Sequence, residues 1–251
     1  MIKLVNVNKA FGDLHVIKDF SADFDQGKIN MIIGQSGSGK TVLLKSIVGL
    51  HEIDDGEVLY NDRDFIKMNF TEKKNIRKEI GMLFQGSALF DSSTVEENVI
   101  FPMNMFTKMT SEEKKDRANY CLQRVNIVNA NHLYPAEISG GMQKRVAIAR
   151  AIALNPKYLF CDEPNSGLDP KTAIVIDNLI KNITEEFNIT TIINTHDMNS
   201  IMEIGDKIIY LYKGEKWWEG NKEEIFDTEN KELNEFVFAS AFAKKVKNLR
   251  N

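Results

Sequence analysis

Eight consecutive residues, Gly34 to Thr41, combine glycines, hydroxyl groups and one lysine at a spacing that suits phosphate binding. They read Gly-Gln-Ser-Gly-Ser-Gly-Lys-Thr and fit the pattern G-x-x-x-x-G-K-[ST], whose glycines let backbone N–H groups turn inward around an anion. Lys40 is expected to reach the β- and γ-phosphates of ATP, and Thr41 to ligate Mg²⁺. The expected nucleotide-binding residues here are Gly34, Gln35, Ser36, Gly37, Ser38, Gly39, Lys40, Thr41 and Val42.

The segments on either side of this loop favour the same interpretation. Residues 29–33 are mostly apolar and indicate a buried strand, and apolar residues at helical spacing follow the loop as far as Gly49. The new helix would place the positive end of its dipole beneath the phosphates. A Gly/Ser loop that merely joins a strand to a helix is the alternative.

Two carboxylates at the end of a second apolar strand are candidates for catalysis. Asp162 and Glu163 follow residues 158–161, and carboxylates at a strand end are costly to bury unless they meet a cation or water. Asp162 suits the Mg²⁺ side of a site and Glu163 suits a base that polarises the attacking water. His196 follows the next buried strand, 190–194, where ligand sites of parallel sheets gather, so we expect it near the γ-phosphate.

Ser139 is a good N-cap for the helix that follows it, and Gly140 and Gly141 come directly after. A capping serine with two glycines exposes several backbone N–H groups, which makes a second anion-binding edge. The alternative is a capped helix with no ligand.

Composition sets the frame for these motifs. The chain has 251 residues, 43% of them hydrophobic and 27% charged, which are ordinary globular values. A net charge of −4 gives no support to nucleic acid as the main partner. Two cysteines far apart in sequence fit a reducing compartment, and no signal peptide or spanning apolar run is found. We therefore expect a cytoplasmic protein whose connection to a membrane comes through a partner.

The rest of the chain suggests both β and helical parts. Alternating apolar residues before and after Gly12-Asp13 indicate antiparallel strands, and a second hairpin is expected at Lys213-Gly214. Phe11, beside the first turn, is either a core aromatic or a platform for a base, and its position alone favours the core. A polar helix is expected over residues 111–128.

The connector that begins at Gln85 carries large apolar residues, Leu89 and Phe90, among small ones. Such residues are buried locally or form a partner surface, and from this stretch alone burial is the better expectation.

Taken in order, these motifs resemble those of an ABC transporter ATPase subunit. The motifs are the phosphate loop, Gln85, the signature Ile138–Met142, Asp162-Glu163, Leu168-Asp169 and His196. The resemblance covers residues 1 to about 225 and implies an α/β P-loop NTPase fold with a RecA-like core, an antiparallel β subdomain and a helical subdomain over about 86–155. It also implies a homodimer in which ATP lies between one subunit's phosphate loop and the other's signature. Met142 departs from the usual glutamine, but Ser139 and the glycine N–H groups are kept.

The resemblance assigns further roles. Phe11 would stack on adenine, His196 would be the switch histidine, and Gln85 would serve both catalysis and the metal. The catalytic set is then Glu163, His196 and Gln85, and the metal set is Thr41, Gln85 and Asp162. The signature edge and Asp169 complete the nucleotide contacts, with integral-membrane permease subunits as partners on the cytoplasmic face of the inner membrane.

Residues 85–103 are similar to those of the ATPases of phospholipid and organic-solvent-tolerance transporters, which implies phospholipid transport and a periplasmic lipid-binding component. ATPases of amino-acid importers and of the cell-division complex share much of this pattern and stay open. A DNA-repair or chromosome ATPase would need a long coiled coil, and no heptad run is present. An iron–sulfur assembly ATPase is a further alternative.

Residues 226–251 are expected to form a C-terminal helical extension that packs on its own domain or reaches the opposite subunit. Its apolar positions are Leu233, Phe236, Val237, Phe238, Phe242, Val246 and Leu249, and its basic ones are Lys244, Lys245, Lys247 and Arg250.

Overall fold

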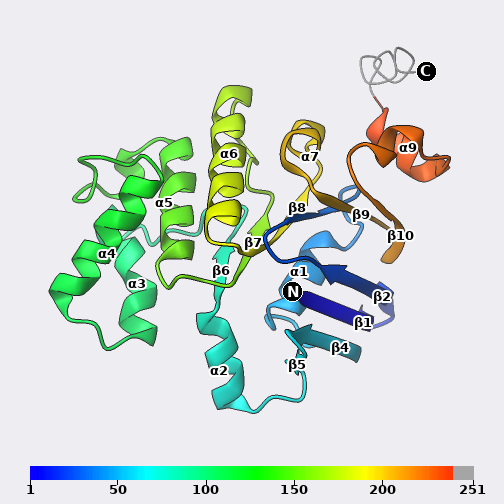
Figure 1. Cartoon of the computed structure of the whole chain (residues 1–251), viewed down its shortest axis with the longest axis horizontal. Helices are drawn as coiled ribbons and strands as arrows, with labels where there is room; N and C mark the ends of the chain where they lie inside the picture. Colours follow the sequence, from blue (N-terminus) through cyan, green and yellow to red (C-terminus); the bar gives the residue numbers. More distant parts are fainter. Residues whose placement is uncertain (240–251) are drawn as a thin grey trace.

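The computed structural model describes residues 1–239. Its strands form two sheets, one of six strands and one of four, with helices on both sides of the larger sheet (Figure 1). The α/β P-loop fold expected from the sequence is therefore confirmed, together with its antiparallel β and helical subdomains.

The six-stranded sheet has the order β10-β9-β3-β8-β7-β6. Its strands are β3 (Ile29–Ile33), β6 (Ile80–Leu83), β7 (Tyr158–Asp162), β8 (Thr190–Thr195), β9 (Lys207–Tyr212) and β10 (Glu215–Gly220). All neighbours pair in parallel except β10, which forms the expected hairpin with β9. The carboxyl ends of β3, β7 and β8 consequently meet at one edge, where a ligand can contact all three strands.

The four-stranded sheet is antiparallel and has the order β2-β1-β4-β5. Its strands are β1 (Ile2–Phe11), β2 (Leu14–Phe24), β4 (Asp55–Tyr60) and β5 (Arg63–Asp64). The hairpin around Gly12-Asp13 is thus where the alternating pattern placed it.

Both faces of the central strands are covered, which explains why β3, β7 and β8 are buried at every position. Successive residues of a strand point to opposite faces. Met31 and Ile33 belong to the core that also contains residues of α5 (Gly140–Ile152), α6 (Pro170–Glu186) and α7 (Met198–Ile204). Ile32 belongs to the second core, shared with α1 (Lys40–Ile47), the antiparallel sheet and Ile76 of α2 (Phe70–Lys78).

The helices α3 (Val95–Phe106), α4 (Ser111–Arg124) and α5 lie together beside the sheet, drawn in green in Figure 1. Thr94 and Thr110 start α3 and α4 with reciprocal capping boxes. The predicted helix 111–128 is four residues too long, because α4 ends at Arg124 and Asn126 takes a left-handed φ of 55°. Apolar spacing continued beyond Arg124, and Val125 and Ile127 are buried in the core outside any helix, whereas Val128 is exposed.

The helix α8 (Glu224–Asp227) spans the predicted boundary at residue 225, and α9 (Lys231–Val237) lies in the predicted extension. Leu233, Val237 and Phe238 are buried in the core that the helices share with β9, so this part packs on its own domain. Seven further predicted positions lie outside the described residues, namely Phe242, Lys244, Lys245, Val246, Lys247, Leu249 and Arg250. The subdomain boundaries at about 86–155 and at 225 stay predictions.

Candidate functional site

The phosphate loop turns tightly between β3 and α1, and its lysine folds back across it. Gly39 has a φ of 107°, a conformation that favours glycine, and a Cβ there would also lie 3.1 Å from the Val16 carbonyl oxygen. The Lys40 ammonium donates to the carbonyl oxygens of Gly34 at 2.8 Å and Gln35 at 3.2 Å. Burial lowers the pKa of Lys40, while the negative charges of Glu163 and Asp162 oppose that shift. A cation held over a ring of backbone groups suits a phosphate ligand.

Around this loop, the remaining predicted residues differ in exposure. Gln35, Ser36 and Gly37 are exposed, whereas Gly34 and Ser38 are buried. Val42 follows Thr41 in α1. It is half-buried, and its side chain packs against the second core.

Asp162 and Thr41 meet at the edge where the strands end. The Thr41 hydroxyl lies 3.1 Å from Asp162 Oδ1, although the two residues are 121 positions apart. Asn194, at the end of β8, donates from Nδ2 to the Lys40 carbonyl at 2.7 Å and to Asp162 Oδ1 at 3.3 Å. Sequence reasoning missed Asn194, whose one signal was a polar residue in an apolar strand. It ties the start of α1 to the acidic strand end.

The donor set fits a Mg²⁺ ion. Hydroxyl and carboxylate oxygens are the ligands that this hard cation prefers, and Thr41 and Asp162 supply one of each. Ser38 Oγ and Asn194 Oδ1 are buried nearby without a hydrogen-bond partner. Within residues 1–239 no group of three or more His, Cys, Asp or Glu side chains could hold a metal alone, so such an ion would also need phosphate oxygens.

Gln85 does not join Thr41 and Asp162. Its side-chain amide lies 3.4 Å from the Ser166 hydroxyl and is exposed to solvent. In this arrangement it faces the loop after β7, and its predicted metal contact stays a prediction.

Glu163 lies between the His196 imidazole and the Lys40 ammonium. Its Oε1 is 2.8 Å from His196 Nδ1 and 3.9 Å from the Lys40 ammonium. Glu163 is the first residue after β7 and has a φ of 48°, which is uncommon for a residue with a side chain. The backbone therefore leaves the extended conformation of the strand at Glu163. The structure therefore brings together the predicted base, the predicted switch histidine and the phosphate-loop lysine.

The signature edge is built as expected but stands apart from the phosphate loop. Ser139 Oγ accepts from the Met142 N–H at 3.2 Å, and Ser139 and Gly140 are exposed. A Cβ on Gly140 would meet nothing within 4 Å, whereas one on Gly141 would touch Thr172. Over residues 1–239 no hydrogen bond or ion pair joins this edge to residues 34–41.

Asp169 caps α6 and is exposed. Its carboxylate accepts from the Thr172 hydroxyl and from the backbone N–H groups of Thr172 and Lys171. These hydrogen bonds, that from the Thr172 side chain above all, lower the pKa of Asp169.

Two aromatic residues are more exposed than their sequence positions suggested. The expectation that Phe11 is a core residue is wrong: its side chain is 46% exposed, edge-on to His51, with Lys9 over the ring. The expectation that the Gln85 connector is buried holds only for half-buried Leu89. Phe90 is 41% exposed and lies 4.6 Å, centroid to centroid, from Phe101 on α3, which is also exposed. No local pattern distinguishes a ring that faces the core from one that faces solvent.

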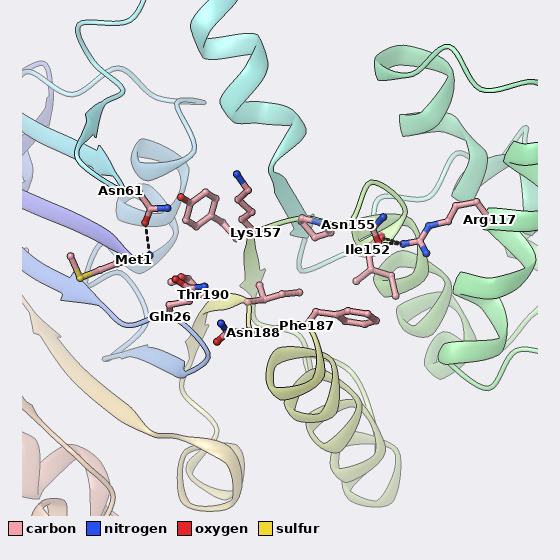
Figure 2. A pocket seen from close by; sticks show the side chains of 13 residues that line it. Met1, Gln26, Asn61, Arg117, Ile152, Asn155, Lys157, Phe187, Asn188 and Thr190 are labelled. Atoms are coloured by element: carbon pink, nitrogen blue, oxygen red, sulfur yellow. Dashed lines mark hydrogen bonds between the residues drawn. The ribbon is translucent and has the colours of Figure 1, made fainter.

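A cavity of about 390 Å³ lies at the opposite end of the central strands (Figure 2). It is lined by residues that begin β7 and β8, Tyr158 and Thr190, so it is separate from the carboxyl-end site. Its cations already have partners: Arg117 donates to the carbonyls that end α5, and Lys157 pairs with Glu79 at 3.3 Å. We assign it no part in phosphate chemistry.

No helix in the part of the chain that the structure describes is both long and apolar enough to cross a membrane.

Comparison with known proteins agrees with this geometry. Residues 17–166 match the ABC transporter family model. The chain is 40% identical to a methionine import ATP-binding protein of Clostridioides difficile strain 630, over 94% of this chain and 74% of that protein. It is 37% identical to a glutamine transport ATP-binding protein of Geobacillus stearothermophilus, over 92% and 95% of the two chains.

Among solved structures, the chain resembles an ATP-binding cassette captured as a dimer in a post-hydrolysis state with ADP and Pi. The TM-score is 0.80 and the identity 36%, over 88% of this chain and 98% of that one. The phosphate loop, the acidic strand end and the capped glycine pair thus occur in a chain whose relatives are named methionine import and glutamine transport ATP-binding proteins, and the chain belongs to the ABC transporter family as one of its ATPases.

Proposed function

We propose that this chain powers an amino-acid importer of the ABC type. The observation that carries the proposal is the similarity to proteins named for methionine import and glutamine transport, at 40% and 37% identity over nearly the whole chain. This was the alternative in the sequence-based prediction of a phospholipid transporter. The phospholipid prediction rests on residues 85–103 alone, and the relatives described above give it no support.

For ATP binding, the backbone N–H groups of residues 34–39 and the Lys40 ammonium would surround the phosphates. The ammonium must exchange the carbonyls of Gly34 and Gln35 for phosphate oxygens, which is favourable because charged acceptors make stronger hydrogen bonds. Thr41 and Asp162 would hold Mg²⁺, and Asn194 keeps them in register. When bound, Mg²⁺ supplies positive charge that neutralises the phosphate oxygens. Phe11, whose side chain is 46% exposed, would stack on the adenine base.

For hydrolysis, Glu163 would accept a proton from the attacking water. His196 Nδ1, 2.8 Å from its carboxylate, fixes the orientation of that carboxylate and leaves the other ring nitrogen for the γ-phosphate. General bases placed in this way contribute typically about 10²–10⁴-fold to the rate.

The signature edge would act on ATP held by a second copy of the chain. Ser139 and Gly140 are exposed and make no hydrogen bond or ion pair with their own phosphate loop over residues 1–239, and a related cassette is dimeric with nucleotide bound. A head-to-tail homodimer supplies each site with the missing donors.

The connection to a membrane permease would run through the exposed pair Phe90 and Phe101. Two neighbouring aromatic rings, each about two-fifths exposed, form an apolar surface next to Gln85. A short permease helix of apolar character can bury both rings.

The decisive experiment is reconstitution of the complex purified through this chain into lipid vesicles. We expect methionine or glutamine, with the matching binding protein, to stimulate ATP hydrolysis and to enter the vesicles. Transfer of labelled phospholipid without amino-acid uptake would overturn the proposal in favour of lipid transport. Absence of Mg²⁺-dependent ATP hydrolysis in the complex would contradict the site assignments themselves.

A further inference from the structure

The loop that follows β6 is held from one side by two cations of α5. The Lys144 ammonium donates to the carbonyl oxygen of Gln85. The Arg150 guanidinium donates to the carbonyl oxygens of Ser87 and Ala88, at 2.7 Å each. Three of the four carbonyls from Gln85 to Ala88 therefore accept from a single helix.

The burial of Lys144 needs an explanation. Its side chain is only 4% exposed, and over residues 1–239 no carboxylate oxygen lies within ion-pair distance of its amine. Burial lowers the pKa of Lys144, and the negative charges of Asp162 and Glu163 oppose the shift. An apolar side chain would avoid the desolvation of a cation, but it would leave the Gln85 carbonyl without its donor.

The loop conformation depends on such donors. Ser87 and Ala88 have φ values of 63° and 48°, in the left-handed region that residues with a Cβ seldom adopt. The Ser87 N–H closes a turn onto the Phe84 carbonyl at 2.9 Å. Without the α5 cations, the loop would lose the bonds that offset this unfavourable conformation.

The same helix reaches two other functional positions. It starts at Ser139, whose hydroxyl caps it, and Arg150 near its other end lies 5.9 Å from the centroid of the Phe90 ring. One rigid helix thus touches the signature edge, the Gln85 loop and the aromatic surface.

We propose that Lys144 and Arg150 clamp residues 85–88 to α5, so that the Gln85 loop, the Ser139 edge and the Phe90 ring move as one body. The effect of the clamp on transport rests on the proposed function. If Phe90 contacts the permease, a clamped loop passes a displacement at Gln85 on to that contact. Neither cation touches nucleotide in this assignment, and both are positioning residues.

The first test measures the clamp without any transport assay. Hydrogen exchange of the isolated chain is compared for wild type, Lys144→Met and Arg150→Met. Methionine removes the charge and the donors at similar length. We expect the Ser87 amide to exchange about tenfold faster or more in both variants, the range of one lost charge-assisted hydrogen bond. In Lys144→Met the Phe90 amide, held by Asn98 Oδ1 of α3 at 2.8 Å, should keep its rate.

Arg145 provides a matched control on the same helix. It donates to the carbonyls of Val125 and Asn126, within the helical subdomain, at 3.3 and 2.7 Å. Arg145→Met removes a comparable cation but should leave the Ser87 amide unchanged. Wild-type exchange at Ser87 in both clamp variants would overturn the proposal, as would equal acceleration in Arg145→Met.

The second test addresses coupling in the reconstituted complex. In Lys144→Met we expect the amino-acid-stimulated kcat to fall about tenfold, while KM for ATP changes less than about twofold. Lys144 does not touch ATP, so its loss affects a step that follows ATP binding and leaves ATP binding itself unchanged. Lys144→Gln, which keeps one donor, should recover part of the loss. A loosened loop with full stimulation would refute the coupling role. If wild type is stimulated by neither methionine nor glutamine, the proposed function fails, and the exchange experiment still decides the clamp.

Discussion

Replacement of the Glu163 carboxylate by an amide is expected to separate ATP binding from ATP hydrolysis. Glu163→Gln keeps the size of the side chain and a hydrogen bond to His196, 2.8 Å away, but removes the proton acceptor. Loss of a general base costs about 10²–10⁴-fold in kcat, or ~3–5 kcal/mol in the barrier. The variant should therefore hydrolyse ATP at least about a hundredfold more slowly than wild type.

The same substitution should strengthen ATP binding slightly. Glu163 lies 3.9 Å from the Lys40 ammonium, and both side chains are mostly buried. The gross attraction at this distance is about 4 kcal/mol for an effective dielectric constant of ~20. The cost of desolvating both charges offsets most of this attraction in a buried pair. We therefore expect a net effect of ~1 kcal/mol or less, so that the Kd for ATP falls by up to about fivefold as Lys40 is released for phosphate.

The assay compares steady-state ATP hydrolysis with calorimetric titration of ATP in wild type, Glu163→Gln and His196→Ala. The histidine variant keeps the carboxylate, so its rate should fall less than that of Glu163→Gln. Hydrolysis by Glu163→Gln within tenfold of wild type, or a clearly weaker Kd, would refute the assignment of Glu163 as the base beside Lys40.

Three further predictions concern the dimer, the permease and pH. A mixture of Ser139→Arg subunits and Lys40→Ala subunits should regain partial ATPase activity, because each heterodimer has one intact shared site. If mixing gives no gain in ATP hydrolysis, measured in a coupled assay, shared sites are excluded. Phe90→Asp should leave ATP binding unchanged but cost about 2 kcal/mol or more in permease association, measured by co-purification across a salt and detergent series. Burial raises the pKa of Asp177, so the wild type loses stability as pH rises from the unfolded-state value of about 4 through the raised folded-state value. Asp177→Asn should accordingly be more stable than wild type at pH 7 in urea unfolding, with the difference vanishing in acid; a difference that persists at low pH would contradict this origin.

Much of the fold could be predicted because its signals are local. A glycine with positive φ, a threonine capping box or an alternating apolar strand expresses a preference of a few neighbouring residues. The phosphate loop, the acidic end of β7 and the Ser139 cap were found on such grounds, and the antiparallel hairpins lie where their turn residues indicated.

Exposure could not be predicted in the same way. Phe11 and Phe90 each stand in a mixed apolar stretch, and only the packing of other elements decides that both rings face solvent. The end of α4 shows the same limit, since apolar spacing continues past Arg124 into a loop in which only Val125, Ile127 and Ala130 are buried in the core.

The sequence by itself determined the candidate residues for phosphate chemistry, because glycine conformation, one lysine and strand-end carboxylates are properties of short segments. Tertiary structure alone decided which of them meet. Asn194 reaches Asp162 across 32 positions and Lys144 reaches the Gln85 carbonyl across 59. These contacts follow from the order of the strands and from the way α5 packs beside them. Strand order is set by the free energy of the whole core and not by any neighbouring residues, so no local pattern encodes it.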